Sequence, residues 1–340
     1  MIIFNHKYSW LCLLVCKKER VITLKHVKKW GLLLAAVLLL ICVGCGEKEP
    51  EVPTPVTTAQ YMSGREVGSL HFWFFANQKH TADRNVKWGD CTLVQLPDGE
   101  YLVIDTADRG YEGEIVQIIK DAGITKIKTA IITHFHEDHY GGLKTFIQNF
   151  GVETVYINAI EADETLEWNT NYAPLKIFVA EIRNMGVEVI PVLAGDSMTF
   201  GEVQVDVLYP AADTAGATTN DTSMVFTMEW KGQRAVFPGD LYYAGESCAL
   251  REIQDVTQLK ADLLKIMHHG ADTSGSGEFI TAVSPSVAVC MGNHVLNNLA
   301  NGRYAKVGCT PYQTWRDGDV CVTFTGEDVE VWASNLQTTN

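Results

Sequence analysis

The chain reads Thr133-His134-Phe135-His136-Glu137-Asp138-His139 immediately after an apolar run, Thr129-Ala130-Ile131-Ile132. The apolar run is typical of a β-strand, so the sequence predicts a loop at the end of a strand that carries three histidines and two carboxylates. Such a loop can aim several imidazoles and a carboxylate at one point. Neutral imidazole and carboxylate are the ligands that hold Zn²⁺ and similar divalent ions. The stretch therefore predicts a metal site.

The His-x-His-x-Asp-His spacing in this stretch resembles the metallo-β-lactamase superfamily. The resemblance implies that His134 and His136 bind one metal ion, and that Asp138 and His139 bind a second. Two adjacent ions lower the pKa of a shared water and polarise the bond that is attacked. We also expect Asp138 to be a catalytic residue that orients the nucleophile. Glu137 is interpreted as an outward-facing residue of the loop.

Two downstream strand ends complete the pattern. An apolar run, Val236-Phe237-Pro238, ends in Gly239-Asp240, and in the family this aspartate bridges the two ions. A second run, Leu263 to Met267, ends in His268-His269 and resembles the position of the closing histidine. We expect His268 to be that ligand of the second ion. His269 is then expected to contact a ligand or the substrate.

One histidine of the usual family pattern is missing, because no histidine lies between His139 and His268. The corresponding place reads Thr219-Asn220-Asp221-Thr222-Ser223. Asp221, or alternatively Asn220, could complete the first metal site through oxygen, which favours a harder ion such as Mn²⁺. The other interpretation is an ordinary turn before a strand, with one metal ion sufficing. We therefore expect one or two divalent ions, with Zn²⁺ first and Mn²⁺ as the alternative.

The Asn-Asp-x-Ser element resembles the ComEC-like branch of the superfamily. Further elements of that resemblance follow in matching order over residues 68–333: Gly89-Asp90, Pro97-Asp98-Gly99, Val103-Ile104-Asp105, Leu264 to Gly270, Ser284-Pro285 and Arg316 to Val320. The branch includes the nuclease-like domain of DNA uptake machinery, so the resemblance implies a phosphodiester or another phosphate ester as substrate. It also implies that Asp105 orients the ligand loop by hydrogen bonds.

Apolar runs with strand character alternate with helical segments along the chain, which indicates an α/β protein. Helices are expected at Glu112–Ala122, Gly142–Phe150 and Pro174–Met185, and strands over most of the other apolar runs. The family resemblance implies the four-layered αβ/βα metallo-β-lactamase sandwich. We assign residues 67–340 to this catalytic domain.

The N-terminal region has the pattern of an export signal. Basic residues precede an apolar run of 14 residues, Trp30 to Val43, which ends in Gly44-Cys45. Residues 1–45 therefore resemble a lipoprotein signal peptide with Cys45 as the lipidated residue, although translation that starts near Val21 is an alternative. An uncleaved membrane anchor is the other interpretation. Residues 46–66 are rich in Pro, Glu and Thr and are predicted to be a flexible tether.

The net charge limits the classes of binding partner, and the spacing of the cysteines limits their roles. The chain has a net charge of −14, but residues 1–45 hold seven Lys and Arg residues against one Glu, so the rest of the chain has 20 basic against 40 acidic residues and is strongly acidic. An acidic body argues against stable binding of nucleic acid, although bound metals can still attract a phosphorylated substrate. The five cysteines after Cys45 lack a close metal-binding spacing, and either one disulfide or free thiols fit them.

These features predict a metal-dependent hydrolase that is exported and held on the outer side of the cell membrane by its lipid anchor. A phosphodiester or another phosphate ester is the expected substrate. A lactone or thioester hydrolase of the same superfamily is the alternative enzyme. A non-catalytic binding lipoprotein that uses metal structurally is the alternative outside enzymes.

Overall fold

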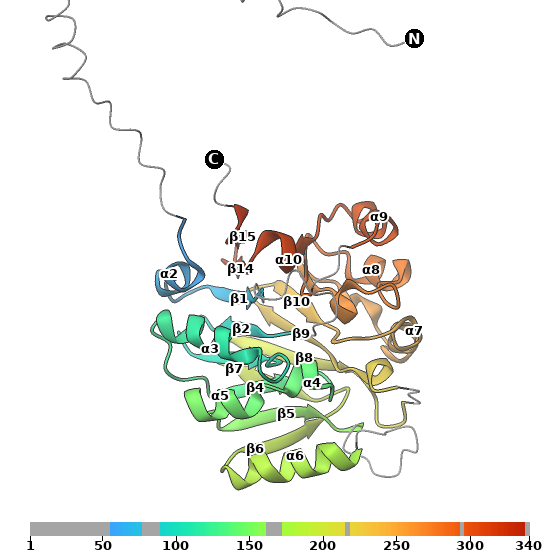
Figure 1. The fold of residues 1–340 in the computed structure, drawn as a ribbon. Coiled ribbons are helices and arrows are strands. Elements are labelled where there is room, and N and C mark those ends of the chain that lie inside the picture. Colours follow the sequence, from blue (N-terminus) through green and yellow to red (C-terminus); the bar gives the residue numbers. More distant parts are fainter. Residues whose placement is uncertain (1–54, 77–88, 161–171, 215–217, 293–295, 337–340) are drawn as a thin grey trace, which may run out of the picture. The chain divides into compact units, whose positions relative to one another are not determined.

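Two β-sheets face each other at the centre of the protein, and helices cover the outer face of each (Figure 1). The computed structural model describes residues 55–76, 89–160, 172–214, 218–292 and 296–336. These ranges lie in one compact unit, Pro55–Asn340. The order of layers is helix, sheet, sheet, helix, which confirms the predicted four-layered α/β sandwich.

The first sheet has eight strands in the spatial order β15-β14-β1-β2-β3-β4-β5-β6. The pairs from β3 to β6 are parallel, whereas the pairs from β15 to β3 are antiparallel. The strand bounds are β1 Leu70–Phe74, β2 Thr92–Gln95, β3 Tyr101–Ile104, β4 Thr129–Ile132, β5 Thr154–Asn158, β6 Glu188–Val192, β14 Val320–Phe324 and β15 Val329–Ala333.

The second sheet has seven strands in the order β13-β12-β11-β10-β9-β8-β7. Here β10 to β13 are parallel and β7 to β10 are antiparallel. The strand bounds are β7 Ser197–Phe200, β8 Val203–Tyr209, β9 Val225–Trp230, β10 Gln233–Phe237, β11 Leu263–Lys265, β12 Val287–Cys290 and β13 Tyr312–Gln313.

The helices that cover the first sheet are α2 Thr58–Ser63, α3 Glu112–Asp121, α5 Leu143–Phe150 and α6 Tyr172–Asn184. Those that cover the second are α7 Tyr243–Glu252, α8 Gly277–Val283 and α9 Asn298–Lys306. The remaining helices of the described ranges are short: α4 Glu137–Tyr140, α10 Thr314–Asp317, and the 3-10 turns η3 Asn220–Thr222, η4 Val256–Leu259 and η5 Met267–Gly270.

Strand side chains alternate between two apolar layers, as the pleat requires. On β4, Ala130 and Ile132 pack under the helices of the first sheet, whereas Ile131 faces the second sheet. The layer between the sheets is rich in aromatic rings, such as Phe72 and Phe237, whose centroids lie 5.8 Å apart. This packing holds the two sheets together, so the strand ends that carry the functional loops keep fixed positions relative to one another.

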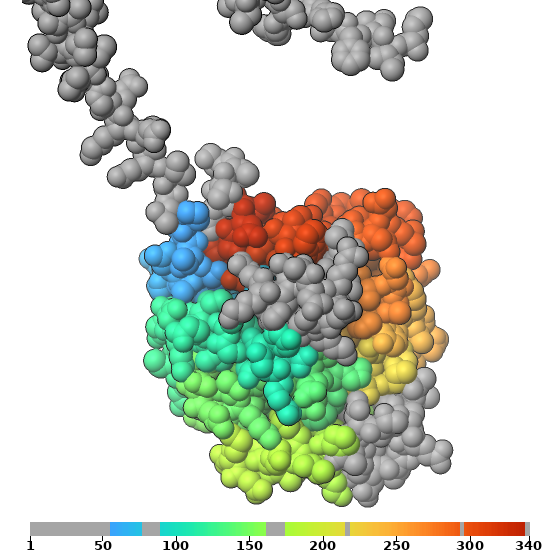
Figure 2. Space-filling view, viewed as in Figure 1, coloured from blue at the N-terminus to red at the C-terminus, as the bar shows by residue number. Residues whose placement is uncertain are grey.

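Helix α2 lies inside the segment that the sequence predicted as a flexible tether, which corrects the predicted boundary at residue 66. Thr57 forms a capping box with Gln60, and the Tyr61 ring stacks on Trp332 of β15 with centroids 4.2 Å apart. Figure 2 shows this first described segment beside the last one. The composition of this segment indicated a linker. Composition does not reveal contacts with residues at the far end of the chain, and these contacts are what order the helix.

The predicted signal peptide, Cys45 and residues 46–54 lie outside the described residues. None of the helices in the described ranges combines the length and the hydropathy that crossing a bilayer requires. The cysteines in those ranges, Cys91, Cys248, Cys290, Cys309 and Cys321, are all free thiols, so the free-thiol alternative is the correct one for them.

Candidate metal centre

The histidine-rich loop is fixed by Asp105 at the end of the neighbouring strand. Asp105 Oδ1 accepts the backbone N–H of Thr133 at 2.8 Å, and Asp105 Oδ2 accepts the Thr133 hydroxyl and contacts His139 Nδ1, each at 2.8 Å. Asp105 itself has a left-handed backbone with φ of 54°, a strained conformation that surrounding contacts must hold. The expected orienting role of Asp105 is therefore seen in its contacts.

The imidazoles of this loop lie close together just after the end of β4. His134 and His139 are completely buried, and their ring centroids lie 4.1 Å apart. His134 Nε2 lies 3.1 Å from His136 Nδ1. Glu137 instead faces outward and pairs with Arg109, as the sequence predicted. The rings of His136 and His139 thus both lie against His134, while the Glu137 carboxylate stays exposed.

Asp240 enters this space from the second sheet. Its Oδ2 atom lies 3.1 Å from His139 Nε2 and 4.0 Å from His134 Nε2. The approach depends on Gly239, which has a φ of 54°, because a Cβ there would lie 2.8 Å from Ser223 Cβ. Ser223 Oγ also accepts the backbone N–H of Asp240 at 3.1 Å. The Gly-Asp pair after β10 therefore lies where the sequence placed it.

The imidazole that contacts Asp240 and Asp138 after β11 belongs to His269, whereas the sequence favoured His268 as the ligand at this position. His269 Nε2 lies 3.1 Å from Asp240 Oδ2 and 3.3 Å from Asp138 Oδ2. His268 Nδ1 instead bonds the Thr273 hydroxyl at 2.7 Å, and its ring packs edge-on against Tyr242. Both histidines have left-handed backbones, so the chain turns sharply after β11 and the second ring of the pair enters the cluster.

The Asn-Asp turn places its two polar side chains differently from the prediction. Asp221 Oδ1 accepts the backbone N–H of Gly245 at 3.1 Å, and Asp221 Oδ2 accepts the Thr218 hydroxyl at 2.8 Å. The carboxylate therefore satisfies the N-terminus of α7, which has no side-chain cap of its own. Asn220 Oδ1 is buried without a hydrogen-bond partner among the described residues, so it is the better candidate for an oxygen ligand.

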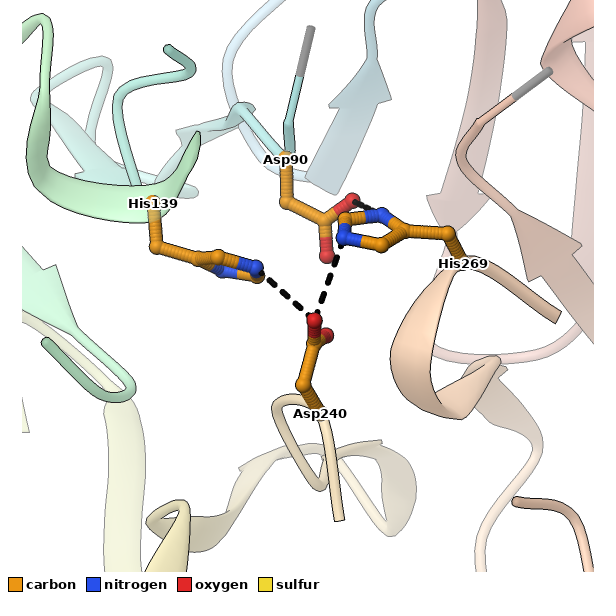
Figure 3. Close-up of side chains that lie close together, drawn as sticks. All are labelled: Asp90, His139, Asp240 and His269. Carbon is orange, nitrogen blue, oxygen red and sulfur yellow. Dashed lines mark hydrogen bonds and ion pairs between the residues drawn. The ribbon is translucent and has the colours of Figure 1, made fainter. Parts of the chain in front are cut away.

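Two residues without a predicted role join the cluster: Asp90 and Lys265. Figure 3 shows Asp90, His139, Asp240 and His269 converging from separate segments. One ligand-type atom from each of these four lies within 4.8 Å of the others. Lys265 Nζ donates to Asp240 Oδ1 at 3.1 Å and forms an ion pair with Asp90 Oδ2. The only signal in the sequence was their place in the matched motifs, next to Gly89 and just before the histidine pair.

The charged residues at the centre shift one another's pKa values. Burial opposes protonation of His139, but the carboxylates of Asp240 and Asp105 outweigh burial and raise its pKa well above the usual value. His269 behaves likewise because of Asp240 and Asp90. Burial also opposes ionisation of Asp240, but the charges of His139, His269 and Lys265 lower its pKa well below the usual value.

A negative potential that retains protons on two imidazoles also attracts a divalent cation, which replaces those protons on binding. Imidazole nitrogen and carboxylate oxygen are the donor types that such ions prefer. The residues present therefore fit a divalent metal ion.

Two further polar residues of the described ranges lie in structural environments. His71 is buried on β1 and bonds the Thr323 hydroxyl at 2.8 Å, which is a structural contact. Tyr304 is buried against α7 and α8. His80 and His294 lie outside the described residues.

The fold and this loop geometry together define a known class of protein. The family model of the metallo-beta-lactamase superfamily matches residues 88–292, which include every loop of the centre. The chain belongs to the metallo-β-lactamase superfamily. Members of this superfamily are mostly metal-dependent hydrolases.

A curated relative lies in the ComEC-like branch, as the motifs predicted. The chain is 29% identical over 179 residues to ComE operon protein 3 of Bacillus subtilis (strain 168), a match that covers 52% of this chain and 21% of the relative. The match therefore spans about a fifth of the relative's length.

Solved structures with a similar chain trace include two that the chain covers almost entirely. One is the metallo-beta-lactamase fold protein YhfI from Bacillus subtilis, with 13% identity, coverage of 72% of this chain and 95% of that chain, and a TM-score of 0.45. The other is a diphosphatase from the PhnP family, with 15% identity, coverage of 75% and 97%, and a TM-score of 0.45.

Proposed function

We propose that this chain is a metal-dependent hydrolase that cleaves a phosphodiester or another phosphate ester. One observation carries the proposal. The Nε2 atoms of His139 and His269 each lie 3.1 Å from Asp240 Oδ2, and Asp138 Oδ2 lies 3.3 Å from His269 Nε2. Imidazole and carboxylate donors arranged around one carboxylate are suited to bind divalent ions.

The proposed ligands follow the sequence pattern with two changes. His134 and His136 would hold the first ion, Asp138 and His139 would hold the second, and Asp240 would supply a carboxylate oxygen to the centre. His269 replaces His268 as the closing ligand, because only its ring reaches Asp240 and Asp138. Asn220 replaces Asp221 at the first site, because the Asp221 carboxylate already accepts two hydrogen bonds.

The chemistry divides between metal and protein. Bound Zn²⁺ or Mn²⁺ would lower the pKa of an attacking water and polarise the phosphorus–oxygen bond. Asp105 and Asp90 fix the ring orientations of His139 and His269 through their Nδ1 atoms. Asp138 is only partly exposed and lies at the edge of the centre, which suits it to orient the water.

The phosphate ester is favoured because the ComEC-like resemblance extends through most of the folded unit. The lipoprotein pattern before residue 46 supports a place of action outside the cytoplasmic membrane, with Cys45 as the anchor. A lactone or thioester substrate, or a binding role without catalysis, are the outcomes that would replace this proposal.

A substrate panel on the purified full chain tests it. After reconstitution with Zn²⁺ or Mn²⁺, we expect hydrolysis of bis(4-nitrophenyl) phosphate that chelation abolishes. Asp138→Asn should retain the fold and lose about 100-fold or more in rate, since it removes the residue that positions water. Glu137→Gln, at the exposed neighbouring position, is the matched control and should keep the wild-type rate.

The other outcomes are distinct. Hydrolysis of a lactone or thioester, but not of phosphate esters, would support the alternative enzyme. Bound metal with no hydrolysis of any substrate would support the binding lipoprotein. A metal content far below one equivalent per chain after reconstitution would contradict metal dependence altogether.

A further inference from the structure

Lys265 places a buried positive charge beside the candidate metal centre. It ends β11, and only 3% of the residue is exposed. Its Nζ atom donates to the Gly239 carbonyl and to Asp240 Oδ1, each at 3.1 Å, and pairs with Asp90 Oδ2. A fixed cation so close to a cation site opposes metal binding. We therefore expect Lys265 to have a role at the centre that offsets its opposition to metal binding.

We propose that Lys265 and Asp90 act as a positioning pair that fixes which atoms of Asp240 and His269 face the metal centre. The inference rests on the proposed function. Because Lys265 holds Oδ1 of Asp240, only Oδ2 faces His139 and His269. Without that contact, rotation of the carboxylate would exchange the two oxygens or present both.

Asp90 sets the second half of the arrangement. Its Oδ1 atom lies 3.0 Å from His269 Nδ1, while Oδ2 faces the Lys265 ammonium. When Asp90 accepts a hydrogen bond from Nδ1–H, the lone pair of neutral His269 is on Nε2, the atom that faces Asp138 and Asp240. One ammonium group thus restrains both the carboxylate and, through Asp90, the imidazole.

The geometry also distinguishes positioning from ligation for Asp90. Asp90 lies close enough to the other donors to be a fourth ligand. Both of its oxygens, however, already have partners in His269 and Lys265. Asp105 is arranged in the same way. One of its oxygens contacts His139 Nδ1, and the other accepts a hydrogen bond from the Thr133 amide. Asp90 is the counterpart of Asp105, with an ammonium in place of an amide.

The pair can exist only because of a close backbone approach. Gly89 has a φ of 64°, and a Cβ there would lie 1.6 Å from the Asp138 carbonyl oxygen. The Asp90 N–H donates to that same carbonyl at 3.0 Å. Asp90 lies just before β2 of the first sheet and Lys265 ends β11 of the second, so the pair also connects the two halves of the sandwich at the centre.

Removal of the ammonium should therefore strengthen metal binding. In Lys265→Met, the second oxygen of Asp240 and the free oxygen of Asp90 become available to the ion, and a nearby positive charge is lost. We expect Co²⁺ to bind about ten-fold or more tightly than to wild type. We also expect weaker visible absorption from bound Co²⁺, since added oxygen ligands move the ion away from tetrahedral geometry. A merely structural lysine would weaken binding or leave it unchanged when replaced.

The experiment uses the purified full chain, with Co²⁺ titration followed by absorption spectroscopy and calorimetry. Lys265→Gln provides a second variant that keeps a hydrogen-bond donor without the charge, and it decides the matter if Lys265→Met does not fold. Arg234→Met is the matched control, because Arg234 forms an ion pair with Glu229 on the neighbouring strand β9. It should retain wild-type affinity and spectrum.

The readouts separate the two proposals. Tighter Co²⁺ binding with an altered spectrum in a folded Lys265 variant supports the positioning pair. Binding no tighter than that of wild type, or an unchanged spectrum, in a folded Lys265 variant overturns it and leaves the proposed hydrolase standing. If the wild-type chain itself binds no Co²⁺, the proposed function fails, and the positioning role fails with it.

Discussion

Asp240 Oδ2 lies 3.1 Å from Nε2 of His269, the second member of a histidine pair whose first member turns away to Thr273. This contact connects the loop after β10 with the loop after β11. The two strands are parallel neighbours, so their carboxyl ends meet at the same edge of the sheet. The edge is where the functional residues of the two halves of the sandwich come together.

The histidine pair gives a direct test of this geometry. His269→Ala should lower the affinity for Zn²⁺ by more than about 10-fold, because it removes a donor from the centre. His268→Ala should leave the metal content near the wild-type value, since that ring bonds Thr273. Metal analysis of the two variants after equal reconstitution is the measurement. The reverse order of effects would restore His268 as the ligand.

Asp240→Ala should be among the most damaging single changes to metal binding. Asp240 lies between the imidazoles of His139 and His269, so its loss removes a shared oxygen donor. We expect a loss of affinity of more than about 100-fold, beyond the effect usual for residues that only orient ligands. Isothermal titration with Zn²⁺ measures it. An affinity within a few-fold of wild type would show that Asp240 is not a ligand.

The adjacent residues Asn220 and Asp221 should behave differently. Asp221→Ala removes the acceptor for the Gly245 amide at the start of α7, so we expect a loss of about 1 kcal/mol of stability with little change in metal content. Asn220→Ala should instead lower metal occupancy, and excess metal should partly restore it. Denaturant unfolding and metal analysis of both variants check this. Loss of metal from Asp221→Ala alone would return Asp221 to the ligand set.

Acid sensitivity should depend partly on His71. Burial lowers the pKa of His71 from 6.5 to about 4, so the folded protein resists protonation that the unfolded chain accepts. Its contribution to stability is therefore complete above pH 6.5 and is lost as the pH falls to about 4. We expect wild type to lose about 3 kcal/mol more than His71→Asn over this window. Urea unfolding at several pH values measures the difference, and parallel curves would contradict it.

The proposed anchor at Cys45 predicts a difference in processing. Wild type should partition with membranes, whereas Cys45→Ala should be released or retained as an unprocessed precursor. Cell fractionation combined with mass spectrometry of the N-terminus checks this. If the two proteins show equal mass and equal partitioning, Cys45 carries no lipid.

Local pattern in the sequence was enough to predict most of the strands and the main ligand loop. The apolar runs before His134 and before Gly239-Asp240 correspond to β4 and to the second half of β10. A strand has a fixed period of two, and a functional loop follows directly at its end, so both are visible in neighbouring residues. Helices α7 and α9 were not predicted, because their apolar faces are short and interrupted by polar residues.

The sequence by itself determined the resemblance to the superfamily, which implied the sandwich, and it placed several candidate donors in one loop, since such a motif depends on spacing along the chain. Only the tertiary structure showed that His269, and not His268, faces Asp240, and that the Asp221 carboxylate accepts hydrogen bonds from Thr218 and Gly245. Adjacent residues in a tight turn point in different directions, and their partners lie on other elements. The structure alone likewise gave Lys265 its contacts with Asp90 and Asp240, because a buried charge is defined by the groups that surround it in space.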